Sequence, residues 1–415
     1  MPGSVIGLVL LLAWPAHILL MAFASWGGTR PARRRKATAP RPAQYWIIVP
    51  CLNEERVVDR TVLAAADLST PSTPVRVLVI DDGSDDDTGV VLSMIVDPRI
   101  QVYRRTAPHA RQGKGQALNA AYRYIRQVTE DSGLHLDDVV IGVIDGDGRM
   151  EPGALDTVSE YFRDPRVGAV QCRVRIHNRT HTLAALQDLE FAAIANAGQT
   201  LRDRVNAVAL GGNGQFTRLS ALASLGDNPW SECLVEDLEL GMRLHLNGVR
   251  IRYIPQVAIT QQGLVDARRL LRQRTRWAQG NLQCLRYAPR LIASRRIGNM
   301  ALMDMMYYLL APWLTILGLV AAPVGLALAW SSLSVATVAA TVGTLFGTMA
   351  VAGLFWALVH RASLKDASLM RCLTAGLAYP FFLCIGLAAT MRGLGRHLTG
   401  RGAWAKTERL VEETA

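Results

Sequence analysis

Charged side chains are absent from three long stretches of this 415-residue chain, 1–29, 305–360 and 372–391. The whole chain is 50% hydrophobic and 19% charged, a balance that excludes a disordered tail or a nucleic-acid-binding arm. Residues 43–300, in contrast, have the composition of an ordinary soluble α/β protein. The sequence therefore predicts a membrane protein with one large water-facing domain.

Glycine-rich phosphate motifs and metal-type cysteine spacings are also missing. No GxGxxG and no GxxxxGK[ST] occurs, which excludes a Rossmann dinucleotide site and a P-loop. The six cysteines contain no CxxC pair. Because at least four of them fall in the part expected to be cytosolic, we expect reduced, mostly buried thiols.

The first apolar stretch, 1–29, is long enough to cross a bilayer, which takes roughly 20 residues. Ala22-Phe23-Ala24 could pass as a signal-peptidase site, but the positive segment that precedes such a site is missing. Basic residues instead follow the stretch, in 30–42. The positive-inside rule then places the next domain in the cytosol. We expect an uncleaved transmembrane helix followed by a basic juxtamembrane linker.

The second apolar region, 301–395, is too long for one crossing and predicts two spans, at about 306–330 and 333–360. A third segment, 369–391, has basic residues at both ends and Pro380 near its centre. A third crossing and a re-entrant or interfacial element are therefore both open. We expect a multi-pass protein of the plasma membrane.

The net charge of +11 is concentrated beside these apolar segments, at 30–41, 268–276 and 392–409. The final segment, 396–415, is basic first and then acidic. Anionic lipid headgroups explain basic clusters in these places better than nucleic acid does.

The soluble part, 43–260, alternates short apolar runs with helix-like stretches. Strands are predicted at 45–50, 75–80, 100–103, 139–144 and 167–175, and helices at 54–68, 85–96, 115–128 and 152–164. This alternation is typical of an α/β domain with a mostly parallel central sheet. Residues 261–300 predict amphipathic helices that lie on the membrane surface.

Acidic clusters follow two of these strands, Asp81-Asp82-Gly83-Ser84 after one and Asp145-Gly146-Asp147 after the other. Each alone could be a simple turn, since Asp, Gly and Ser are turn formers. Together they place carboxylates at one edge of the sheet, where α/β proteins bind ligands. Two carboxylates spaced i, i+2 suit Mg²⁺ or Mn²⁺ with positions left for phosphate oxygens. A nucleoside diphosphate is the expected partner.

Three further features fit such a ligand. Lys114 lies in a glycine-flanked loop and could reach a phosphate or a base carbonyl. Glu236-Asp237 begins a predicted helix; acidic residues there complement the helix dipole, and one could also accept a proton from an attacking hydroxyl. In Gln273-Arg274-Thr275-Arg276-Trp277, an arginine can clamp a diphosphate and the tryptophan face can stack on a sugar ring.

These motifs, with Pro50-Cys51-Leu52-Asn53-Glu54 before them, occur in the order seen in processive family-2 glycosyltransferases. The chain resembles the cellulose, chitin, hyaluronan and poly-N-acetylglucosamine synthases of that family over about residues 43–300 and the flanking membrane segments. The resemblance implies a GT-A domain embedded between transmembrane helices, a UDP-sugar donor, Mg²⁺ or Mn²⁺, and inversion at the anomeric carbon.

The resemblance also implies roles for individual residues. Asp237 is the expected general base, with Glu236 beside it, and Asp145 and Asp147 are the expected metal ligands. Trp277, with Gly212 and Asn213, is expected to contact the acceptor. The donor nucleotide is expected to bind Pro50, Asn53, Glu54, Asp81 or Asp82, Lys114, Asp145, Gln273 and Arg276.

Two functions follow as hypotheses. The first is processive extension of a β-linked polysaccharide from UDP-N-acetylglucosamine or UDP-glucose. The alternative is a glycolipid synthase that adds a sugar to diacylglycerol or a similar lipid, because such enzymes share the Gly211–Phe216 loop sequence and the QxxRW motif. The chain departs from polymer synthases in its single N-terminal span, and an accessory subunit or self-association could supply further helices.

Overall fold

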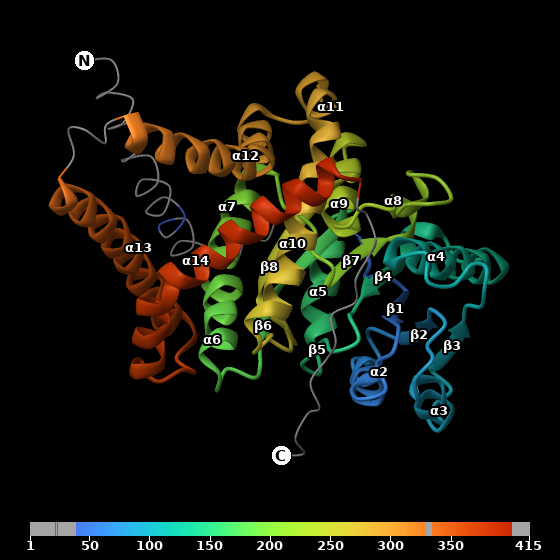
Figure 1. Ribbon diagram of the computed structural model, residues 1–415. Helices are drawn as coiled ribbons and strands as arrows, with labels where there is room; N and C mark the ends of the chain where they lie inside the picture. Colours follow the sequence, from blue (N-terminus) through green and yellow to red (C-terminus); the bar gives the residue numbers. More distant parts are fainter. Residues whose placement is uncertain (1–20, 22, 24–38, 329–333, 401–415) are drawn as a thin grey trace.

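The computed structural model describes residues 39–328 and 334–400, together with Met21 and Phe23 (Figure 1). The predicted N-terminal helix and most of the basic linker lie outside the described residues, as does the segment 401–415.

One eight-stranded sheet forms the centre of the soluble part. Its strands lie in the order β3 (Ile100–Arg104), β2 (Val75–Asp81), β1 (Gln44–Cys51), β4 (Val139–Val143), β7 (Gln215–Arg218), β6 (Val167–Ile176), β8 (Arg250–Gln261) and β5 (Arg149–Met150). The five strands predicted from sequence are all present.

The prediction of a mostly parallel sheet is correct in part: four of the seven strand pairings are parallel and three are antiparallel. Strands β3, β2, β1 and β4 are parallel neighbours, and β6 and β8 also pair in parallel. Strand β7 runs antiparallel to both β4 and β6, and β5 runs antiparallel to β8, so the sheet is mixed. Because β7 runs antiparallel to β4, Gln215, the first residue of β7, pairs with Val143, the last residue of β4. The loop before β7 therefore lies at the edge where β4 ends.

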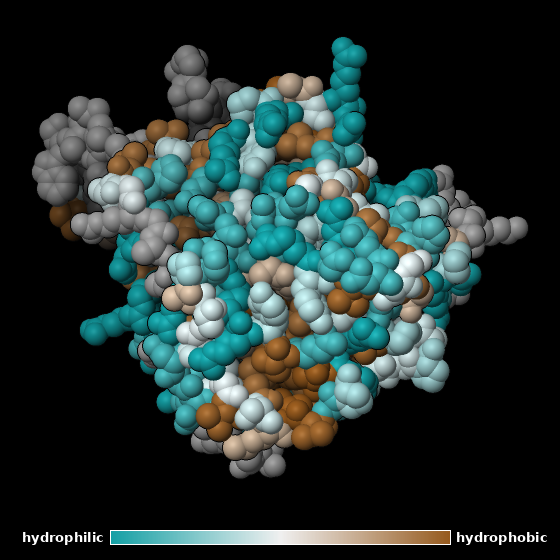
Figure 2. Space-filling model, turned by 90° about the vertical axis from the view of Figure 1, so that its right-hand side faces the viewer, coloured by the Kyte–Doolittle hydropathy of each residue, from teal (hydrophilic) through white to brown (hydrophobic). Residues whose placement is uncertain are grey.

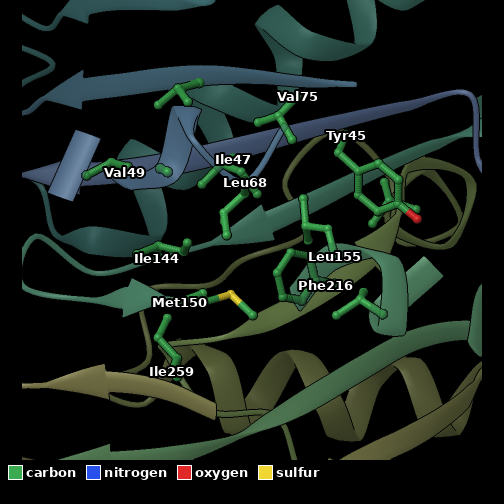
Figure 3. Packing of buried hydrophobic residues seen from close by; sticks show 14 of the residues in the cluster. Tyr45, Ile47, Val49, Leu68, Val75, Ile144, Met150, Leu155, Phe216 and Ile259 are labelled. Atoms are coloured by element: carbon green, nitrogen blue, oxygen red, sulfur yellow. The ribbon is translucent and has the colours of Figure 1, made fainter. Parts of the chain in front are cut away.

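Helices cover both faces of this sheet, because alternate residues of the central strands point to opposite sides. In β1, Tyr45, Ile47 and Val49 join one apolar cluster, packed with side chains of α2 (Val58–Ala66) and α5 (Ala154–Phe162) (Figure 3). Trp46 and Ile48 join a second cluster with α4 (Lys114–Asp131) and α9 (Glu236–Leu246). The four helices predicted between the strands are confirmed, including α3 (Thr88–Ser93).

A helical layer that the sequence did not predict connects β6 to β7. It consists of α6 (Thr182–Leu189), a π-helical turn (Glu190–Ala195) and α7 (Asn196–Val205), before the short α8 (Leu219–Ala223) follows β7. π-Helical turns inside α-helices occur frequently at functional sites.

The described residues of the C-terminal part are mostly helical, with short non-helical links at 294–298 and 365–368. The amphipathic region contains α10 (Ala267–Cys284) and α11 (Ala288–Ala293), and the apolar region contains α12 (Asn299–Leu328), α13 (Val335–Leu364) and α14 (Leu369–Leu398). Helix α14 continues unbroken past Pro380, so the chain does not re-enter there, and it packs along both α13 and α10 (Figure 1). Among the described residues, two helices are long and apolar enough to cross a membrane, 342–364 and 369–398. A multi-pass topology stays a prediction.

The two ends of the molecule differ in surface hydropathy. The side that carries α3 and α4 is mostly hydrophilic, with a hydrophobic area low on it (Figure 2). Helices α12 and α13 lie at the other end of the molecule, and α14 runs from α13 across α10 (Figure 1). The chain thus separates a water-facing end from an apolar end.

A buried ion cluster joins the soluble domain to α13. The carboxylate of Asp188, which is 1% exposed, accepts hydrogen bonds from Arg175 in β6 (3.2 Å) and from the backbone N–H of Ile176 (2.8 Å). His360 of α13 places its Nε2 2.9 Å from the same carboxylate. Burial alone would raise the pKa of Asp188, but these partners outweigh burial and lower its pKa below the usual range.

We expect Asp188→Ala to destabilise the fold by about 3–5 kcal/mol, because it leaves a buried cation without its partner. Since the folded-state pKa of Asp188 is lowered, its contribution is complete above the unfolded pKa of about 3.9 and decreases as the pH falls below that value. Thermal unfolding at pH 7 and at about pH 2.5, below the unfolded pKa, measures both effects. Asp366→Ala is the matched control, because its more exposed carboxylate contacts the same Arg175 (2.8 Å); an equal loss in the control would contradict the assignment.

Candidate active site

A cavity of about 760 Å³ lies at the carboxyl ends of the parallel strands, bounded also by α10, α12 and α14. It brings together most of the residues that the sequence singled out: Pro50, Glu54, Asp82, Lys114, Asp145, Gly212, Asn213, Glu236, Asp237, Gln273, Arg276 and Trp277. The other three candidates, Asn53, Asp81 and Asp147, do not line it.

Asp81 and Asp82, at the end of β2, face different surroundings. The carboxylate of Asp81 accepts the backbone N–H of Ser84 (2.8 Å) and faces Arg104, so it stabilises the turn. Asp82 lines the cavity and accepts a hydrogen bond from Arg105 at 2.5 Å. Burial raises the pKa of Asp82 although Arg105 opposes the rise. Asn53 stabilises the same region, because its amide donates to Asp85 (2.6 Å).

Asp145 and Asp147 occupy different depths. Asp147 is fully buried and accepts the backbone N–H of Gln262 at 2.9 Å. Asp145 faces the cavity, and its backbone N–H donates to the side-chain oxygen of Asn213 (3.2 Å). Asp145 is therefore the carboxylate of this pair that a ligand meets first.

The ammonium group of Lys114 lies between acidic groups from two elements. Its Nζ is 2.5 Å from Asp145 and 3.5 Å from Glu236, and it donates to the carbonyl of Gly212 (3.3 Å). Burial alone would lower the pKa of Lys114, but the attraction of Asp145 and Glu236 outweighs burial and raises it. The lysine is thus held as a cation at the centre of the site.

Glu236 and Asp237 begin α9, and Lys114 lies between Glu236 and Asp145. Burial raises the pKa of both carboxyl groups, while the charges of Lys114 and Arg276 oppose the rise. The backbone N–H of Leu238 donates to Asp237 (2.8 Å) and fixes one of its oxygens. A buried carboxylate with a raised pKa is a stronger base than an exposed one.

A loop of small residues lies against this charged group. A Cβ atom added to Gly212 would be 3.0 Å from the Lys114 ammonium and 3.2 Å from an Asp237 oxygen. The neighbouring Gly211 donates its N–H to Gln171 (2.7 Å) of β6. A side chain at 212 would therefore be tight against both charged groups, and one of them would have to shift to admit it.

Helix α10 contributes a wall with Gln273, Arg276 and Trp277. Arg276 donates to the carbonyl of Leu234 (2.9 Å), which connects α10 to the loop before Asp237. The guanidinium of Arg274, 4.6 Å from the centre of the Trp277 ring, also pairs with a carboxylate of the π-helical turn. The tryptophan ring is thus held from one side by a cation.

Sequence reasoning missed Glu239, whose buried carboxylate accepts hydrogen bonds from Arg286 (2.7 Å), Ser231 and Tyr287. It joins the loop before α9 to the turn after α10. No local pattern distinguishes it from any acidic residue in a first helical turn, and only the fold shows its partners.

Sequence reasoning also missed the part of the cavity that lies beside the C-terminal helices. There the wall is formed by Gly198 and Arg202 of α7, Tyr308 of α12, and Gly386 of α14, among others. Arg202 donates to Asp304 of α12 (2.8 Å). The cavity therefore runs from the charged group to the helices of the apolar region.

Residues 41–280 match the family model described as "Glycosyltransferase like family 2". The chain belongs to glycosyltransferase family 2. The resemblance inferred from the motifs is confirmed, and the protein is a glycosyltransferase. Its cysteines are free and, apart from Cys384, buried, as expected.

Named relatives of this glycosyltransferase fall into two groups. It is 31% identical over 282 residues to a beta-monoglucosyldiacylglycerol synthase from Synechocystis, across 67% of this chain and 56% of that protein. It is 27% identical over 243 residues to a poly-beta-1,6-N-acetyl-D-glucosamine synthase from Staphylococcus aureus, across 57% and 54%. The matches thus span little more than half of these curated relatives.

The fold of the glycosyltransferase is similar to that of a solved structure. The mannosyltransferase PcManGT from Pyrobaculum calidifontis, in complex with GDP-Man and Mn²⁺, matches with a TM-score of 0.66. The two share 20% sequence identity, and the match covers 96% of this chain and 99% of that one. This likeness supports the GT-A fold.

We expect Gly212→Ala to lower the transfer rate by about tenfold to 10²-fold, because the new methyl group displaces Lys114 or Asp237. Gly211→Ala is the matched control, since a Cβ there meets its nearest atom, in Gln171, at an ordinary 3.7 Å. Initial rates at saturating donor, with thermal unfolding to confirm folding, measure the effect. Similar rates for the two variants would argue against close contact at Gly212.

Proposed function

We propose that this family-2 enzyme transfers a sugar from a UDP-sugar, with inversion, to a hydroxyl of diacylglycerol or a similar membrane lipid. One observation carries the proposal: a single cavity joins the carboxylates of Asp145 and Asp237 to side chains of α12 and α14. The relatives named as glucosyldiacylglycerol synthases support it. An apolar acceptor can lie along the helices while its hydroxyl reaches the charged end.

The donor end of the cavity fits a nucleoside diphosphate. Asp82, Lys114, Gln273 and Arg276 all line this end of the cavity. In this proposal Asp82 contacts the uridine and the other three contact the diphosphate. An arginine binds phosphate oxygens strongly because it presents paired N–H donors. Of the alternatives Asp81 and Asp82, the exposure to the cavity favours Asp82. Pro50 and Glu54 complete this wall, with Asn53 supporting it from behind.

The residues present fit a divalent cation, Mg²⁺ or Mn²⁺. Asp145 offers hard oxygen ligands to the cavity with Asp147 behind it, and the Lys114 ammonium now beside Asp145 shows that the position attracts a cation. Among the described residues, no group of three or more His, Cys, Asp or Glu side chains could hold a metal. The donor's phosphate oxygens would therefore complete the coordination, and the ion would stabilise charge on the leaving diphosphate.

Asp237 is the base in this proposal. As the acceptor oxygen attacks the anomeric carbon, its proton passes to the Asp237 carboxylate, and the sugar–phosphate bond breaks on the opposite face. Lys114 and Arg276 stabilise the negative charge that leaves with UDP, an interaction that strengthens toward the transition state. Glu236, 3.5 Å from the Lys114 ammonium, holds that lysine in place.

Processive extension of a β-linked polysaccharide is the second candidate. It is favoured by the Trp277 ring in the cavity wall, which Phe191 packs against at 6.3 Å between ring centres. Such a ring can support a terminal sugar, and the poly-N-acetylglucosamine synthases are relatives.

For both candidate functions we propose that α13 and α14 anchor the enzyme in the plasma membrane with its catalytic domain in the cytosol. An accessory subunit or self-association stays a prediction.

We expect the purified enzyme in vesicles containing dioleoylglycerol to transfer radiolabel from UDP-glucose or UDP-N-acetylglucosamine to solvent-extractable lipid. The transfer should require Mg²⁺ or Mn²⁺. Asp237→Asn should lower the rate by about 10²- to 10⁴-fold, the usual contribution of a general base, with calorimetric UDP affinity retained. Because burial raises the pKa of Asp237, the wild-type rate should fall as the pH decreases through that raised value.

Label found only in high-molecular-weight material would replace the lipid proposal with the polysaccharide one. Undiminished turnover by Asp237→Asn would remove the base assignment without affecting the choice between acceptors.

We expect Gly386→Leu to raise the KM for the lipid acceptor by about tenfold or more, with the KM for the donor unchanged. Gly386 lines the cavity, and a Cβ there meets no described atom within 4 Å, so a larger side chain is expected to narrow the cavity at this point. Gly395→Leu, on the same helix, is the matched control: its Cβ also meets nothing within 4 Å, but it does not line the cavity. Equal acceptor KM values for the two variants would place the lipid elsewhere.

A further inference from the structure

Two cysteines from distant parts of the chain contact each other close to the proposed base. Cys233 lies in the loop before α9, and Cys284 is the last residue of α10. Both thiols are free, and their Sγ atoms are 3.8 Å apart. The pair thus connects the segment that leads into Asp237 with the helix that carries Trp277.

The backbone beside Cys233 is held to α10 by hydrogen bonds as well. Arg276 donates to the carbonyl of Leu234 (2.9 Å), and the side-chain oxygen of Gln283 accepts the N–H of the same residue (3.0 Å). A displacement of Cys233 would therefore move Leu234, and with it the contact of Arg276 and the start of α9 at the proposed base.

A small molecule can reach Cys233 from the surface. The residue is 9% exposed and lines a second cavity of about 460 Å³, whose other lining residues include the exposed Asn228 and Glu232. Cys284 is fully buried and does not line this cavity. The contact with Cys233, together with burial, raises the pKa of Cys284, which keeps it a thiol. Since exposure and thiolate character determine which cysteine is oxidised, an oxidant meets Cys233 first.

We propose that Cys233 and Cys284 are a site of reversible oxidation by peroxide, and that the disulfide between them inhibits sugar transfer. Hydrogen peroxide converts the thiol of Cys233 to a sulfenic acid, and one water leaves. The sulfur of Cys284 then attacks the sulfur of Cys233, so that an S–S bond forms and the S–O bond breaks. The departing hydroxide leaves with the Cys284 proton as a second water. Two thiols and one peroxide thus give one disulfide and two waters.

The contact between the two thiols favours the second step, because it makes the attack intramolecular. In the cytosol, where thiols are kept reduced, disulfides of this kind are usually transient and redox-sensing. The reduced pair seen here is therefore the resting state, and oxidation is the signal.

The inhibition follows from the geometry of a disulfide. Its sulfurs are about 2.05 Å apart, so the two residues must approach each other from the present 3.8 Å. That movement displaces Leu234 relative to α10 and shifts Arg276 and Asp237 relative to each other. A misplacement of about 1 Å at an active site can lower a rate by about 10²-fold. The effect goes beyond the proposed function, since it acts on transfer to either acceptor.

The test treats the full chain in vesicles with hydrogen peroxide and then with dithiothreitol. We expect peptide mapping by mass spectrometry to find the disulfide between Cys233 and Cys284. The transfer rate should fall by about tenfold to 10²-fold and recover with dithiothreitol. Cys233→Ser should transfer at about the wild-type rate and lose the inhibition by peroxide.

Cys372→Ser is the matched control, because this cysteine of α14 is also buried, at 5% exposure; it should be inhibited as the wild type is. Thermal unfolding shows that each variant folds. Cys284→Ser is a second variant, in which dimedone should trap the sulfenic acid on Cys233; labelling of another cysteine alone would overturn the assignment of the first step.

Equal inhibition of the wild type and Cys233→Ser would overturn this inference and leave the proposed function standing. A mapped disulfide with an unchanged transfer rate would overturn the inhibition. If the reduced wild type transfers label to neither lipid nor polymer, the proposed function fails, and peptide mapping still decides whether the disulfide forms.

Discussion

The Lys114 ammonium is the charge on which the arrangement of this site depends. Asp145 follows β4 and Glu236 begins α9, so two separate elements bring carboxylates into one partly buried space. Buried carboxylates repel each other and lose their hydration, which would raise their pKa values until they took up protons. A cation 2.5 Å from Asp145 and 3.5 Å from Glu236 offsets much of this cost. Under the proposed function, the flexible stem of the lysine would let the same group turn to a phosphate if a metal ion took its place at Asp145.

The antiparallel direction of β7 determines where the loop before it lies relative to Lys114, Asp145 and Asp237. Had this strand run parallel to β4, the loop of small residues before it would lie at the opposite edge of the sheet. Running antiparallel, it places Gly212 beside Lys114 and Asp237, and Asn213 against the backbone of Asp145. The departure from a parallel sheet is thus what brings this loop against the charged residues of the cavity.

The soluble domain and the apolar helices build one cavity between them. The π-helical turn Glu190–Ala195 lies in the wall, and the helix before it carries Asp188, which pairs with His360 of α13. Helix α14 contributes Gly386 to the same wall and packs along α10. A shift of α13 or α14 relative to the sheet would therefore change the shape of the cavity beside these helices, whereas its charged end is formed by the strand edges and α10.

The sequence by itself determined the chemistry at the strand ends. Alternating βαβ units place the carboxyl ends of parallel strands at one edge, so Asp82 and Asp145 had to meet there. Ordered motifs identified the family and with it Asp237 and Trp277. Only the tertiary structure decided that Asp82 rather than Asp81 faces the cavity, that Asp147 is fully buried, and that β7 is reversed. Only the tertiary structure also showed that Arg202, Asn281, Tyr308 and Gly386 line one cavity. These residues lie on separate helices, and the packing of those helices depends on contacts between segments that are distant in the sequence. No local sequence pattern records such contacts.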